Sequence, residues 1–166
     1  MITTHAYERY LVHQPTDWRA AAWAGLIAGV VFLIVEMAMV ALFEGQSPWG
    51  PPHMIAAMAM GPEVLPPPGA PAEFDFGIVM AAMLIHFPLA LAYGLAIGWI
   101  VHQLRPGLAS IAGLVIGFAI YLINFYPIAA AAFPWFAMAR GWVSAVAHMI
   151  FGLAAAVAYL ALRRPH

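Results

Sequence analysis

FGIVMAAMLIHFPLALAYGLAIGWIV, residues 76–101, is the stretch that decides the fold of this chain. A helix needs roughly 20 apolar residues to cross the hydrocarbon core of a bilayer, and this stretch is long enough without a single charged residue. Its one ionisable side chain, His86, lies about 15 Å from the start of the segment at ~1.5 Å of rise per residue. Lipid offers an imidazole no hydrogen-bond partner at that depth, so His86 is a candidate functional residue.

The composition extends this interpretation to the whole chain of 166 residues. Hydrophobic residues make up 65% of it and charged residues only 8%, against a usual charged share of about 25% in soluble domains. Three further segments have the length of a membrane span, at about 20–43, 108–127 and 141–162. We therefore predict an all-α integral membrane protein, a four-transmembrane-helix bundle forming a single domain over residues 1–166. The first span is expected to be retained, because no cleavable signal precedes it.

The distribution of arginine predicts an orientation in the membrane. The positive-inside bias places arginine-rich connections in the cytoplasm. Arginine precedes the first span, lies between the second and third, and follows the fourth: Arg9, Arg19, Arg105, Arg163 and Arg164. Both termini are therefore expected in the cytoplasm, with residues 44–75 as a periplasmic loop of a bacterial inner-membrane protein.

Prolines divide the two outer connections. In the first, two proline-rich stretches bracket residues 53–61, which predicts a short interfacial or re-entrant helix. In the other, Pro127 and Pro134 interrupt residues 128–139, which we expect to lie along the outer surface.

Three of the four spans carry nearly the same glycine pentapeptide. The copies are GLIAG at 25–29, GLAIG at 94–98 and GLVIG at 113–117. Small residues four apart let helix backbones approach closely in lipid. These motifs lie in the predicted cytoplasmic half, so the bundle should be tightly closed there, which argues against a continuous pore.

Polar residues follow the same helix faces toward the outer side. Steps of three, four or seven residues from the glycines stay on one face of a helix. These steps lead to Glu36, to His86, to Tyr121 and Asn124, and to His148 and Ser144. We predict that these side chains form a pocket that faces the periplasm, under a lid made of residues 49–60 and 133–140. Pro88 is expected to kink its helix and widen the pocket.

Several chemistries fit such a pocket. His86 and His148 could be the axial ligands of a b-type haem, as in other helical bundles. Alternatively, Glu36 and these two histidines, with His53 from the loop, could bind zinc, iron or copper. If it is not a ligand, His53 is expected to be a solvated surface residue, because it follows a proline-rich stretch. A third alternative needs no cofactor: the same groups could relay protons, bind a small polar solute or only hydrogen-bond to one another. Arg140 is expected either to cap the outer surface or to neutralise Glu36.

Other function classes receive little support. The chain has no cysteine, which excludes disulfides and thiolate metal sites. It has no lysine and a net charge of -1, so it offers no basic surface for nucleic acid. Ser144 lies one turn from His148 but no oxyanion donor is evident, so the sequence does not indicate an enzyme.

Four motifs on the predicted outer side resemble a known family. They are SPWGPPHMIAAMAMGPEVLPPP at 47–68, HFP at 86–88, NFY at 124–126 and FPWFAMARGWVSAVAHMIFG at 133–152. Together they resemble a family of small four-helix bacterial inner-membrane proteins of unassigned function, sometimes labelled sodium:proline symporter. The resemblance covers most of the chain from Trp18 onward and implies the fold and the outer-face site.

These observations give three functional hypotheses. The leading one is a membrane protein that binds haem b or a metal ion, for electron transfer or metal handling beside a respiratory complex. The second is a structural accessory subunit of a larger membrane complex. The third is a transport component that works as a homo-oligomer.

Overall fold

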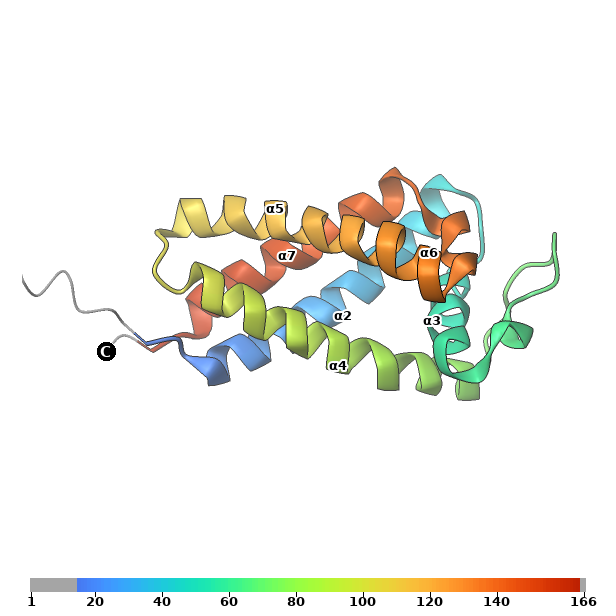
Figure 1. Cartoon of the computed structure of the whole chain (residues 1–166), viewed down its shortest axis with the longest axis horizontal. Coiled ribbons are helices and arrows are strands. Elements are labelled where there is room, and N and C mark those ends of the chain that lie inside the picture. Colours follow the sequence, from blue (N-terminus) through green and yellow to red (C-terminus); the bar gives the residue numbers. More distant parts are fainter. Residues whose placement is uncertain (1–14, 165–166) are drawn as a thin grey trace, which may run out of the picture.

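The computed structural model describes residues 15–164, and this part of the chain folds into helices without strands (Figure 1). The four long helices are α2 (Trp18–Phe43), α4 (Phe76–Val101), α5 (Pro106–Ile123) and α7 (Trp142–Leu162). The short ones are α3 (Gly50–Met60), η2 (Pro62–Val64), η3 (Asn124–Ile128), α6 (Ala129–Ala132) and η4 (Pro134–Ala139). The predicted all-α bundle is confirmed, and α3 begins a few residues before the helix expected at 53–61. Arg9, used above for the orientation, lies outside the described residues.

Within residues 15–164, four helices are long and apolar enough to cross a membrane, so the composition is that of a multi-pass membrane protein. The third span differs from the prediction, because it runs through α5, η3 and α6 as Pro106–Ala132. Pro127 was expected to end this helix and instead lies inside a π-helical turn. Helices in apolar surroundings tolerate proline where local π-type adjustments satisfy the backbone groups that it frees. Residues 128–132 therefore extend the third span. Of the segment expected along the outer surface, only residues 133–139 lie beyond the end of this span. Pro88 likewise lies inside α4 without ending it.

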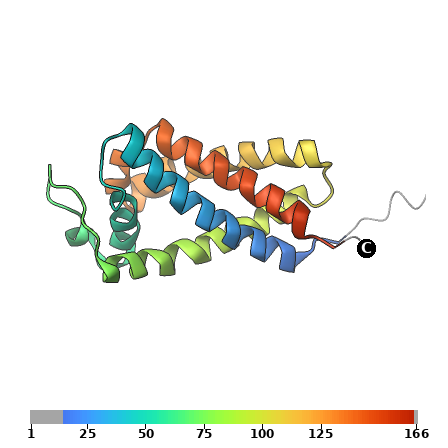
Figure 2. The same ribbon diagram turned by 180° about the vertical axis from the view of Figure 1, so that it is seen from behind.

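The long helices pack in the order α5, α7, α2, α4. Helix α7 packs against both α5 and α2, and α2 packs against α4. Figure 2 shows α2 and α7 side by side on the rear face. Helices α4 and α5 are joined by a short turn and diverge away from it (Figure 1). We call the end with this turn, residue 15 and residue 164 the terminal end, and the end with α3, α6 and η4 the capped end.

Glycine brings the helices into backbone contact in the half nearer the terminal end. A Cβ atom added to Gly94 would overlap the backbone of Gly25, and one added to Gly25 would lie 2.5 Å from the carbonyl oxygen of Ala90. On the other side of the bundle, a Cβ on Gly113 would lie 2.5 Å from the carbonyl oxygen of Gly152. The close approach predicted from the three pentapeptides is confirmed for α2 with α4 and for α5 with α7.

We expect Gly94→Ala to destabilise the protein by about 1–3 kcal/mol, the usual cost of overpacking. The added methyl group would meet the backbone of Gly25, which cannot rotate away as a side chain can. The midpoint of heat- or SDS-induced loss of helical circular dichroism measures this. Gly107→Ala is the matched control, because a Cβ at Gly107 meets nothing within 4 Å. Equal stability of the two variants would contradict the close packing of α2 on α4.

Asp17 caps the first long helix at the terminal end. Its Oδ1 accepts a hydrogen bond of 2.9 Å from the backbone N–H of Ala20, as a helix N-cap does. Its Oδ2 accepts one of 3.3 Å from the backbone N–H of Arg164, just beyond α7. These hydrogen bonds, that of Ala20 above all, lower the pKa of Asp17 from its ordinary value of 3.8.

The capping contribution should therefore depend on pH. Because the pKa of Asp17 is lowered in the folded protein, its contribution is complete above about pH 4 and is lost as the pH falls through the folded value. We expect Asp17→Ala to cost about 1 kcal/mol at pH 7 and less in acid, and Asp17→Asn to keep the cap. Unfolding of the three proteins from pH 7 down to about pH 2 tests this. An unchanged difference between wild type and Asp17→Ala across that range would refute it.

Candidate functional site

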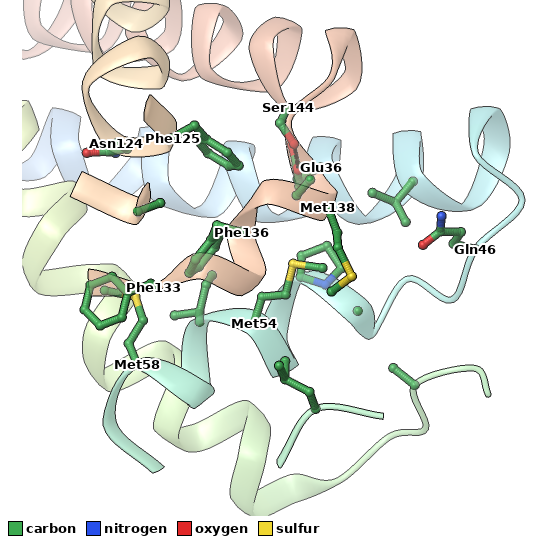
Figure 3. Close-up of a pocket in the computed structure, with 18 of the residues that line it drawn as sticks. Glu36, Gln46, Met54, Met58, Asn124, Phe125, Phe133, Phe136, Met138 and Ser144 are labelled. Carbon is green, nitrogen blue, oxygen red and sulfur yellow. Dashed lines mark hydrogen bonds between the residues drawn. The ribbon is translucent and has the colours of Figure 1, made fainter. Parts of the chain in front are cut away.

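A cavity of about 710 Å³ lies at the capped end of the bundle. Residues from all four long helices line it, together with α3, η3, α6, η4 and the proline-rich loop at 65–72. Figure 3 shows Glu36 and Ser144 on its wall, and Met54, Met58 and Phe133 where the short helices cover it. Two hydrogen bonds hold these covering segments: Trp135 Nε1 donates to Met54 O over 3.1 Å, and Ser47 Oγ donates to Ala72 O over 2.5 Å. The lid predicted from residues 49–60 and 133–140 is thus confirmed.

Glu36 is the central polar residue of the cavity wall. Its side chain is 95% buried, with 5% exposed. Ser144 Oγ donates a hydrogen bond of 2.6 Å to Glu36 Oε1. Glu36 Oε2 is buried and has no hydrogen-bond partner within residues 15–164. Burial of a polar atom without a hydrogen-bond partner costs free energy. The described part of the chain therefore leaves this oxygen without a donor that it needs.

The two histidines line the same cavity as Glu36, and each has one ring nitrogen within hydrogen-bond distance of a carbonyl oxygen. His86 Nε2 lies 3.0 Å from the carbonyl oxygen of Gly29, and His148 Nδ1 lies 2.7 Å from that of Ser144. A carbonyl oxygen can only accept, so these nitrogens carry the hydrogen in the neutral rings. His86 Nδ1 and His148 Nε2 are therefore the acceptors. Both residues line the cavity.

Helix α4 and the turn η3 contribute a second polar pair. Tyr93 donates its hydroxyl hydrogen to Asn124 Oδ1 over 2.7 Å, which joins α4 to the start of η3, directly after α5. Both residues line the cavity. Tyr121, predicted beside Asn124, is buried but does not line the cavity. Its ring packs 5.8 Å from that of His148 and supports it from behind.

Two predicted site residues have other contacts. Arg140 does not neutralise Glu36, because its Nε donates to the carbonyl oxygen of Phe125 over 2.8 Å and its guanidinium lies 5.1 Å from the centre of the Tyr126 ring. His53 is not the solvated loop residue that its position suggested. It is buried in α3, with Nδ1 lying 2.9 Å from Trp49 O, and it does not line the cavity.

The geometry gives the haem and metal hypotheses no direct support. Within residues 15–164, no three histidine, aspartate or glutamate side chains are grouped closely enough to hold a metal ion. A bis-histidine haem requires its plane between two imidazoles. Here both imidazoles contact Phe32, with ring centroids 5.6 Å from His86 and 4.7 Å from His148, and His86 Nε2 contacts Gly29. Both hypotheses stay predictions.

Some residues of the site were missed in the sequence. Phe32 precedes Glu36 by one helical turn and could have been placed on the same face. Tyr93 follows His86 by seven residues, which is also the same face. The prolines at 66–68 line the cavity, but no periodicity in the sequence indicates how a loop folds back.

We expect Ser144→Ala to destabilise the protein by about 1–3 kcal/mol, because it leaves both oxygens of a buried carboxyl group without a partner. Ser110→Ala is the control, since the Ser110 hydroxyl is exposed and donates only to Pro106 O within the first turn of α5. Unfolding midpoints in one detergent compare the two variants. If both lose equally little stability, the hydrogen bond to Glu36 contributes nothing.

Searches against protein-family models, curated proteins and solved structures find no match for this chain. The resemblance to small four-helix inner-membrane proteins therefore stays an expectation from its motifs. A functional proposal has to depend on the cavity and the residues that line it.

Proposed function

We propose that this protein is a membrane-embedded binding protein that holds a small, largely apolar ligand in the cavity at its capped end. The observation that supports this is Glu36, which lines the cavity and has a buried carboxyl oxygen without a hydrogen-bond partner among residues 15–164. A cavity of about 710 Å³ is within the size range of small-molecule sites. Such sites combine apolar walls with a few converging polar groups, and Glu36, His86 and His148 provide these here.

The charges support an orientation with the cavity toward the periplasm. Arg19, Arg105, Arg163 and Arg164 lie at the terminal end, and Glu44, Glu63, Glu73 and Asp75 lie in the connection at the capped end. The positive-inside bias therefore favours a cytoplasmic terminal end. We propose that the chain is a multi-pass protein of a bacterial inner membrane with this orientation.

The first test is whether the purified protein carries a ligand. We expect native mass spectrometry to show an additional bound mass on the wild type. Ala129→Phe should reduce this mass, because Ala129 is buried and lines the cavity. Ala131→Phe, on the same helix but exposed and outside the cavity lining, should retain it. A bare wild type, or equal amounts bound by both variants, would reject the proposal.

The same sample tests the haem and metal predictions. A Soret band that disappears in both His86→Ala and His148→Ala would establish haem. Stoichiometric copper, zinc or iron without such a band would establish a metal site. Copurification with respiratory subunits, without any bound group, would favour the accessory role and count against a binding protein.

A further inference from the structure

The cavity has a net negative lining. Among the described residues that line it, Glu36 and Glu44 are acidic, and arginine and lysine are absent. Arg140, the basic residue at this end, is held by Phe125 O and Tyr126. An anionic ligand would therefore meet like charge and no basic partner, whereas a cation would supply the charge that a buried carboxylate needs.

Among the described residues, the polar atoms of Glu36, His86 and His148 that have no hydrogen-bond partner are acceptors. They are the buried Oε2 of Glu36 and the unprotonated ring nitrogens of the two histidines, which line the same cavity. The one hydroxyl group at Glu36, that of Ser144, is already donated to Oε1. Amide donors of Asn124 and Gln46 lie elsewhere on the lining, at the α4–α5 side and at the end of α2. A ligand that satisfies the Glu36 wall must therefore bring its own N–H or O–H donors.

The remaining walls suit an apolar body that carries a positive charge. Six aromatic rings line the cavity: Phe32, Tyr93, Phe125, Phe133, Phe136 and Phe151. Aromatic faces attract cations and also bury apolar groups. The thioethers of Met54, Met58 and Met138 add adaptable apolar surface.

We infer that the ligand is an amphiphilic organic amine in its protonated form, whose ammonium group pairs with the carboxylate of Glu36 while its apolar body fills the aromatic and methionine-lined part. This inference depends on the proposed binding function and names the ligand class. A quaternary ammonium ion carries the charge but no N–H donor, so it fits less well. A neutral alcohol brings a donor but no charge, and a carboxylate brings the wrong charge.

Four probes of nearly equal size separate these possibilities: 4-phenylbutylamine, 4-phenylbutanol, 4-phenylbutyrate and 4-phenylbutyltrimethylammonium. We would measure their binding at pH 7 by isothermal titration to the protein in phosphatidylcholine nanodiscs, with empty nanodiscs subtracted. The amine should bind at least about ten-fold more tightly than the alcohol, because a hydrogen bond to a charged group is worth more than ten-fold in affinity. The quaternary ion should lie between them, and the carboxylate should not bind.

Two variants test whether the preference for the amine depends on Glu36. Glu36→Gln should weaken the amine about ten-fold or more and leave the alcohol unchanged. Glu63→Gln, an exposed acid that does not line the cavity, should bind like the wild type. Unfolding midpoints show whether Glu36→Gln is folded. If it is not, the alcohol and carboxylate comparisons on the wild type still test the inference.

The outcomes separate this inference from the function on which it depends. Equal binding of amine and alcohol, or tight binding of the carboxylate, overturns the amine class and leaves a binding protein. Absence of binding by all four probes, with a copurified mass present, does the same. Absence of both binding and a copurified mass overturns the two proposals together.

Discussion

Backbone contact at glycine is the constraint on which the rest of the structure depends. Burial of apolar surface gives no drive for association between helices in lipid, so close packing has to supply it. Gly25 with Gly94, and Gly113 with Gly152, bring two pairs of helices together in the half nearer the terminal end. Helices α4 and α5 contact each other little and diverge from their common turn (Figure 1). The helices are thus closely packed near the terminal end, while α4 and α5 separate toward the capped end. This separation creates the cavity that the short helices cover.

The glycines also position the histidines directly. The carbonyl oxygen of Gly29 lies 3.0 Å from Nε2 of His86, and a Cβ on Gly29 would lie only 3.3 Å from that nitrogen. On the opposite pair of helices, a Cβ on Gly117 would overlap the carbonyl oxygen of His148. A larger residue at either glycine would therefore move a histidine as well as a helix. The same glycine contacts therefore set both the packing of the helices and the positions of the two histidines.

The sequence predicted most of this arrangement because helices repeat. The four spans followed from their length, and Glu36, His86, Asn124, Ser144 and His148 followed from counting along glycine-bearing faces. The prediction was wrong about residues 128–132, which continue a helix that Pro127 was expected to end. Helix propensity alone predicts that proline ends a helix. Whether the helix continues depends on the tertiary surroundings, because a π-type turn can satisfy the backbone groups that proline frees. The solvated position predicted for His53 was wrong for a similar reason, since the fold of the proline-rich loop has no periodicity to follow.

The π-helical turn explains why Arg140 does not neutralise Glu36. In this turn the N–H of Ala129 donates to Asn124 O, five residues back, and not to Phe125 O, its usual helical partner four residues back. Arg140 donates to Phe125 O instead, and its guanidinium also lies over Tyr126 of the same turn. Arg140 is the basic residue that its sequence position placed near Glu36. Because of these contacts with Phe125 O and Tyr126, it does not pair with Glu36 in the described part of the chain. The third span thus gains a continuous helix, and the cavity keeps an acidic oxygen for which a donor has to come from outside the fold.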